Sequence, residues 1–229
     1  MNLYLIRFSI SLVAGLIWAI AGLFYNSVCG KDLLTDGEKE EKLKFFPHIA
    51  LLFAAGTVIT FVSGLISLSF SPVLFMLPSV AMLTTVISEI RNGSISLFGI
   101  IITGLSALVY WAFLFFSGNS DGLVQRLISA GIMAAIVLIS EFFCRKIARS
   151  GSLGWLRGGL IISYAAFAPA LQSVVMVLLA LVAVLLWCTV KKFYHKGTSR
   201  GYKSVFDVPY RFSPVLFGTY LFLAMIGWL

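Results

Sequence analysis

The chain has 229 residues, of which 60% are hydrophobic and 11% are charged, and its mean hydropathy is +1.01. So few polar residues cannot cover a water-soluble globule, which excludes a soluble enzyme or binding module. The net charge of +8 would suit a nucleic-acid partner, but the basic residues lie between apolar runs, without interleaved aromatic side chains. We therefore expect contact with membrane lipid and no nucleic-acid partner.

The apolar runs are long enough to cross a hydrocarbon core of about 30 Å, and they lack the alternating polarity of barrel strands. They predict an all-α fold, a polytopic bundle in which residues 1–229 form a single membrane domain. In chain order, helices are predicted at residues 3–25, 49–70, 73–90, 95–116, 124–146, 155–168, 171–190 and 212–228.

Two of these eight predicted helices need comment. The first run is too long for the apolar region of a signal peptide and has no small-residue cleavage site, so we interpret it as a membrane span. The sixth helix is short, and Pro169 separates it from the seventh. The alternative is a seven-helix bundle in which the sixth and seventh helices are continuous.

Basic residues indicate the orientation of the bundle, since they concentrate in cytoplasmic loops. Of the 17 lysines and arginines, all but Arg7 and Arg126 lie in, or within three residues of, the segments that follow predicted helices one, three, five and seven. This pattern predicts a bacterial-type inner membrane protein with these basic loops in the cytoplasm and both termini on the other side. Residues 26–48 form the longest polar loop, whose mixed charges favour a short solvated turn.

Several kinds of site find no support in the sequence. Cys29, Cys144 and Cys188 are isolated, and His48 and His195 fall in different loops, so no disulfide framework or metal site is expected. Neither a nucleophile elbow nor a glycine-rich phosphate loop is present. We therefore expect no metal and no cofactor.

Three segments at predicted helix ends resemble the prepilin peptidases, which are polytopic aspartic proteases. They are residues 88–96 (SEIRNGSIS), 152–157 (SLGWLR) and 208–218 (VPYRFSPVLFG). They are similar in position to the family's Asp-bearing stretch before Ile-Pro-Asn, its Gly-x-Gly-Asp-x-Lys stretch and its proline-rich start of the last helix. The residues that carry this frame are Arg91, Gly154, Arg157, Pro209, Pro214 and Gly218. The paired-cysteine module that many members carry after helix one is absent from residues 26–48.

The resemblance implies a site in which both family aspartates are replaced. Glu89 stands at the first position and Trp155 at the second. Such a protease needs two carboxylates that share a proton, one acting as base and one as acid, and tryptophan can do neither. We expect Glu89 and Trp155 to lie close together at the membrane boundary, with the indole filling the space of the lost pair.

Glu141 is an alternative second acid, because an ionisable group inside a predicted span marks a candidate site. A structural role is the competing interpretation, in which Glu141 pairs with Arg145 one turn later. The sequence thus favours a degenerate aspartic endopeptidase homologue, a pseudoenzyme of the type IV pilus or protein secretion class that binds or assembles pilin-like or other single-span proteins. The alternatives are an active leader endopeptidase with an altered carboxylate pair and, less favoured, a small transporter.

Overall fold

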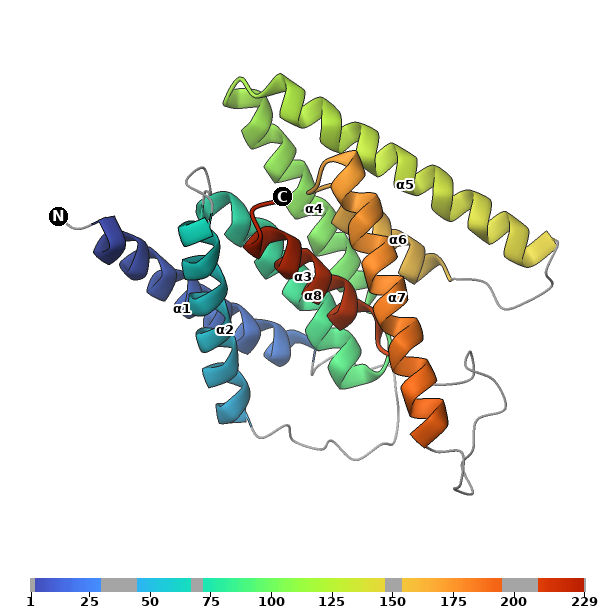
Figure 1. The fold of residues 1–229 in the computed structure, drawn as a ribbon, viewed down its shortest axis with the longest axis horizontal. Coiled ribbons are helices and arrows are strands. Elements are labelled where there is room, and N and C mark those ends of the chain that lie inside the picture. The colour runs from blue at the N-terminus through green and yellow to red at the C-terminus, as the bar shows by residue number, and fades with distance from the viewer. Residues whose placement is uncertain (1–2, 30–44, 67–71, 147–153, 195–209, 229) are drawn as a thin grey trace.

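The computed structural model describes residues 3–29, 45–66, 72–146, 154–194 and 210–228. Within them, every regular element is an α-helix, and eight such helices occur (Figure 1). They are α1 (Leu3–Cys29), α2 (Phe45–Ile66), α3 (Pro72–Asn92), α4 (Leu97–Phe116), α5 (Ser120–Lys146), α6 (Trp155–Ala165), α7 (Ala170–Tyr194) and α8 (Phe212–Met225). The predicted all-α bundle is therefore confirmed. Helices α1 and α2 also occupy both ends of the segment 26–48 that was predicted to be a loop.

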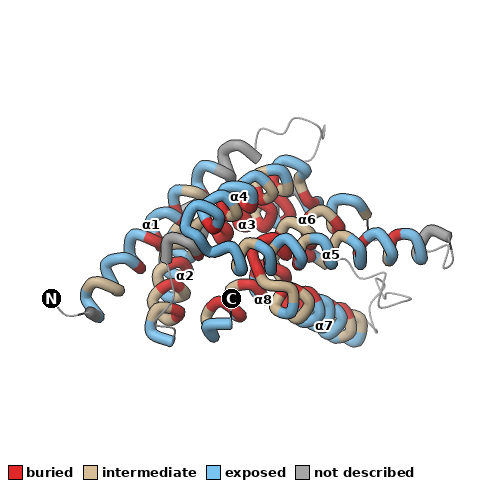
Figure 2. The backbone as a smooth tube through the Cα atoms, turned by 90° about the horizontal axis from the view of Figure 1, so that it is seen from above, coloured by how far each residue is buried: buried red, intermediate tan, exposed pale blue. Residues whose placement is uncertain are grey.

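Five of the eight described helices lie around three central ones. Helices α1, α2, α4, α5 and α7 lie on the outside, while α3, α6 and α8 supply most of the side chains with no exposed surface. In the second view, the outer helices are pale blue on their outward faces and red toward the centre (Figure 2). Helix α3 packs against α1, α4 and α8, and α6 packs against α4, α5 and α7. The core is therefore built around the three central helices α3, α6 and α8.

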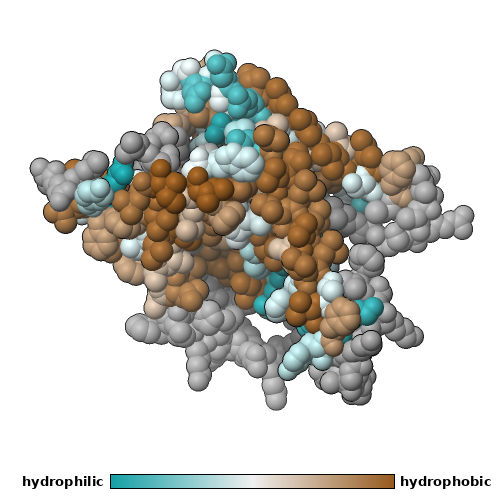
Figure 3. Space-filling view, in the orientation of Figure 1, coloured by the Kyte–Doolittle hydropathy of each residue, from teal (hydrophilic) through white to brown (hydrophobic). Residues whose placement is uncertain are grey.

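Among the described residues, the five outer helices are long and apolar enough to cross a membrane, and the apolar stretch Phe75–Ile90 of α3 is shorter. Leucine, isoleucine, valine and phenylalanine cover most of their described outward surface, and the apolar band is visible in Figure 3. Helix α6 has 11 residues and α8 has 14, so they extend about 16 and 21 Å at 1.5 Å per residue. Both are shorter than a hydrocarbon core of about 30 Å. The long helices around them therefore shield these short helices from lipid.

Helices α6 and α7 are separate, so the seven-helix alternative is wrong. Helix α6 ends at Ala165 and α7 begins at Ala170, just after Pro169. The turn between them leaves carbonyl groups that cannot bond within either helix, and neighbouring helices supply the donors. Trp111 Nε1 donates to Ala166 O at 2.8 Å, Arg126 Nε donates to Phe167 O at 3.1 Å, and Ser129 Oγ donates to Ala165 O at 2.9 Å. A broken helix is stable within a membrane when protein groups satisfy its backbone in this way.

Most described basic residues lie at one end of the bundle, which we call the Arg157 end. There, the end of α3 meets the starts of α6 and α8 through contacts of Glu89 and Arg157. Lys191 and Lys192 lie in the last turn of α7, which runs back toward this end from the α6–α7 turn. Arg126 lies near that turn, at the opposite end. The predicted cytoplasmic position of the Arg157 end stays a prediction.

Thiol labelling in intact cells tests this orientation. In a variant with Cys29 as its sole cysteine, a membrane-impermeant maleimide is expected to react only after the inner face is exposed. A sole cysteine at Asn119, in the α4–α5 turn, is expected to react from outside. The reverse pattern would invert the orientation, and labelling of both sites from one side would contradict three crossings, by α2, α3 and α4, between them.

Candidate functional site

Glu89 lies in the last turn of α3, and its carboxylate is bound by the start of α8. Only 2% of the residue is exposed. Its Oε1 accepts a hydrogen bond from Phe212 N at 2.9 Å, and its Oε2 accepts one from Ser213 N at 2.6 Å and another from Ser213 Oγ. Gly93, with φ near +70°, ends α3 by donating its N–H to Glu89 O at 3.1 Å. The acid is therefore fixed by both its backbone and its side chain.

This carboxylate caps a helix that has no local cap. The first N–H groups of a helix lack partners within it, and Arg211, at the N-cap position of α8, gives no side-chain hydrogen bond. Glu89 accepts the first two N–H groups, and Pro214, third in the helix, has no N–H to satisfy. The negative charge also lies at the positive end of the α8 dipole. A distant acid and a proline together make a buried helix start possible.

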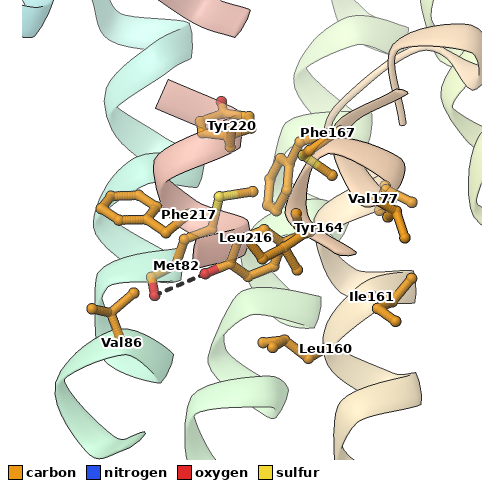
Figure 4. Close-up of a cluster of buried hydrophobic side chains, with 14 of the residues drawn as sticks. Met82, Val86, Leu160, Ile161, Tyr164, Phe167, Val177, Leu216, Phe217 and Tyr220 are labelled. Carbon is orange, nitrogen blue, oxygen red and sulfur yellow. Dashed lines mark hydrogen bonds between the residues drawn. The ribbon is translucent and has the colours of Figure 1, made fainter. Parts of the chain in front are cut away.

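A second set of hydrogen bonds lies one turn deeper in the bundle. Thr85 Oγ1 and the Tyr164 hydroxyl are 3.0 Å apart, and the same hydroxyl donates to Met82 O at 3.3 Å (Figure 4). Ser213 Oγ also lies 3.4 Å from Thr85 O. Thr85, Tyr164 and Ser213 have no exposed surface. These contacts join α3, α6 and α8 through hydroxyl groups in an otherwise apolar core.

The three sequence segments singled out for their resemblance meet at this end of the bundle. The Arg157 guanidinium carbon lies 4.9 Å from the centre of the Tyr210 ring, which gives a cation–π contact between the start of α6 and the residues before α8. Tyr210 is two residues from Phe212, whose N–H is bound by Glu89. Residues from 88–96, 152–157 and 208–218 therefore form one connected site.

Trp155 does not have the predicted role. It is the first residue of α6 and is 64% exposed, so it does not fill an interior space beside Glu89, and that prediction is wrong. A position at the beginning of a short helix directs this side chain to the surface of the bundle. The proximity of Trp155 and Glu89 remains a prediction. Gly154, the residue before it, has φ near +85°, a backbone conformation that glycine adopts without the steric cost that other residues have.

The remaining candidate residues have varied positions. Glu141 is 7% exposed in α5, and its expected partner Arg145 belongs to the part of α5 whose side chains are not described. The Arg91 side chain and Pro209 also lie outside the described parts. Pro214 is half-buried in the first turn of α8, whereas Gly218 is exposed and no atom lies within 4 Å of where its Cβ would stand. The structure thus gives Pro214 a role and Gly218 none.

The arrangement holds the Glu89 carboxylate as a structural acceptor. Three hydrogen bonds from α8 occupy three of the about four acceptor sites of this carboxylate, which fixes its orientation toward α8. Among the described residues, no group of three histidine, cysteine, aspartate or glutamate side chains could hold a metal ion. The site as it stands is suited to joining helices.

Sequence reasoning found Glu89 but missed the groups that bind it. Thr85 and Tyr164 are hydroxyl residues within apolar runs that no motif marks, and Ser213 lies in the segment 208–218 without having been singled out. Their one signal is that a hydroxyl inside a membrane helix needs a partner. No protein-family model matches the chain, and no characterised protein or solved structure is significantly similar to it.

The substitution Tyr164→Phe tests the deeper hydrogen bonds. It is expected to lower the free energy of unfolding by about 1 kcal/mol, because it removes one hydroxyl from a buried polar contact. Denaturation in mixed micelles, followed by circular dichroism, measures this loss. Tyr4→Phe, at a residue that is 62% exposed, is the matched control and should change nothing. If Tyr164→Phe and Thr85→Val gave fully additive losses, the two hydroxyls would not be coupled.

Proposed function

We propose that the chain is a non-catalytic, prepilin-peptidase-like protein of a bacterial-type inner membrane that binds single-span helices such as those of pilin-like precursors. The observation that carries this proposal is the Glu89 carboxylate, 2% exposed and bonded through both oxygens to α8. An acid in the position of the family's first aspartate therefore serves to hold a helix in place.

Loss of catalysis follows from the chemistry of the two replaced positions. A proton-sharing pair needs two carboxylates in close, precise contact with a water molecule. Glu89 is committed to Phe212 and Ser213, and Trp155, at the second position, has an indole that neither accepts nor releases a proton at physiological pH. The two replaced positions therefore do not supply an acid and a base at once.

Retention of the frame supports a binding role. The three segments lie at the Arg157 end and are held together by Glu89, Arg157 and their contacts with α8. In the family that the chain resembles, this end meets the substrate where its helix leaves the membrane. A scaffold that keeps this convergence without the acids can engage the same class of helix without cutting it.

Proteoliposomes test both parts of the proposal. The purified protein is reconstituted with a labelled pilin-like precursor that consists of one apolar helix preceded by a short basic leader. We expect energy transfer between the two proteins and an uncleaved precursor by mass spectrometry at every pH. A single-span polyleucine helix without the leader is the matched control and should show markedly weaker transfer.

Two results would overturn the proposal: one concerns the partner class and the other the absence of cleavage. Equal transfer for precursor and control would remove the proposed partner class. Cleavage at a single site would instead support an active leader endopeptidase. Loss of that cleavage in both Glu89→Gln and Glu141→Gln, with folding retained, would then identify these residues as its acids.

A further inference from the structure

A groove opens between α1 and α4, with α3 as its floor. Its volume is about 700 Å³, and its lining residues come from α1, α3 and α4. The residues that line it are Ser9, Ile10, Val13, Ile17, Met76, Leu77, Val80, Ala81, Ile102 and Ser106. Eight of these ten side chains are hydrocarbon or thioether, so the groove suits an apolar occupant.

The two hydroxyls in the lining do not alter this conclusion. Ser9 Oγ donates to Leu5 O at 2.9 Å within α1, and Ser106 Oγ donates to Thr103 O at 2.8 Å within α4. Each proton is thus used inside its own helix. None of the lining residues is charged, so a polar ligand would lose its hydration without gaining a compensating interaction.

The groove is continuous with the lipid-facing surface. Ile10, Val13 and Ile17 line one wall and are 38%, 53% and 37% exposed. These residues belong to a helix that is long and apolar enough to cross the membrane. We propose that the groove binds one acyl chain of a bilayer phospholipid, held between α1 and α4 against Leu77 and Val80 of α3. This inference does not depend on the proposed function.

The lining favours an acyl chain over a transmembrane helix. Helices associate in membranes through small residues that allow close approach and through polar side chains that bond across the interface. Here the walls and floor are mostly branched or long side chains, and Ala81, at the floor, is 3% exposed. A flexible chain can follow such an irregular surface, whereas a helix 10–12 Å wide would contact only its rim.

Native mass spectrometry of the full chain, released from mild detergent, tests the proposal. The unmodified protein is expected to retain one phospholipid. The double variant Val80→Trp with Ser106→Trp places two indoles in the groove and is expected to reduce phospholipid occupancy by about tenfold or more. The matched control is Val109→Trp with Ala112→Trp, on the exposed face of α4, and should retain the lipid. Circular dichroism checks that each variant is folded.

Any of four results would overturn the proposal. They are an unmodified protein without a phospholipid, a filled groove with unchanged occupancy, an adduct whose mass is that of detergent or a free fatty acid, and co-purification of a single-span peptide in place of lipid. If the double variant fails to fold, Ser106→Trp alone is the second variant. Its serine bonds only within α4, and equal phospholipid occupancy in this variant and the unmodified protein would contradict the inference.

Discussion

Replacing Glu89 with alanine is expected to lower the free energy of unfolding by about 3 kcal/mol. The substitution leaves Phe212 N, Ser213 N and Ser213 Oγ without the acceptor that they use inside the bundle. Each buried donor left unpaired costs about 1–3 kcal/mol, and some of this is recovered as the start of α8 shifts or admits water. Denaturant titration in mixed micelles, followed by circular dichroism, measures the loss.

Two further variants make the Glu89 prediction specific. Asp121→Ala removes an exposed carboxylate from the first turn of α5 and should cost at most about 1 kcal/mol. Glu89→Gln keeps one acceptor oxygen but turns an amide toward donors, so its loss should lie between those of the control and alanine. A loss for Glu89→Ala no greater than for Asp121→Ala would mean that the carboxylate does not hold α8.

This structural role changes how any activity measurement on Glu89 must be interpreted. In an active protease, loss of function in Glu89→Gln would indicate a lost acid. Here the same substitution also loosens the attachment of α8 to α3, because Glu89 joins them directly. Only a variant with unchanged unfolding free energy and lost activity would report on chemistry.

The fold could be predicted because the membrane allows few solutions. Long apolar runs without alternation must form helices, and Pro169 marks the break between α6 and α7. Helix ends were harder to place. Helix α1 runs to Cys29 and α2 starts at Phe45, so both extend into residues that polarity assigned to a loop. Polarity marks where a helix leaves the lipid, which is not always where the helix ends.

The site could be predicted in position but not in role. The sequence places Glu89 at a helix end, yet its partners lie 123 and 124 residues away, and no local pattern connects them. The prediction that Trp155 fills an interior space was wrong for a related reason. A motif frame gives the order of residues, whereas the direction of a side chain at the start of α6 depends on how that helix packs. Tertiary contacts determine both the role of Glu89 and the direction of the Trp155 side chain.

Close packing of α1 on α2 provides a second place where one residue controls stability. Gly15 lies where the two helices cross, and an added Cβ would stand 2.5 Å from Phe53 O and would also overlap Thr57 Oγ1. Gly22 differs, because its added Cβ would overlap the end of the Leu52 side chain, which can rotate away. Small residues at such crossings let two backbones approach in a membrane.

Gly15→Ala is therefore expected to cost about 2–3 kcal/mol of unfolding free energy, because a backbone carbonyl cannot move aside unless the helices separate. Gly22→Ala should cost less than about 1 kcal/mol. The matched controls are Gly104→Ala and Gly131→Ala, where no atom lies within 4 Å of the added Cβ, and alanine there should be neutral or slightly stabilising. The same micelle titration measures all four variants. A double variant separates the two obstacles to the added Cβ at Gly15. Adding Thr57→Ala to Gly15→Ala removes the threonine hydroxyl but leaves the Phe53 carbonyl in place, so only part of the lost unfolding free energy should return. Full recovery would show that the threonine hydroxyl is the whole obstacle, and equal losses at Gly15 and Gly104 would contradict the close crossing of α1 and α2.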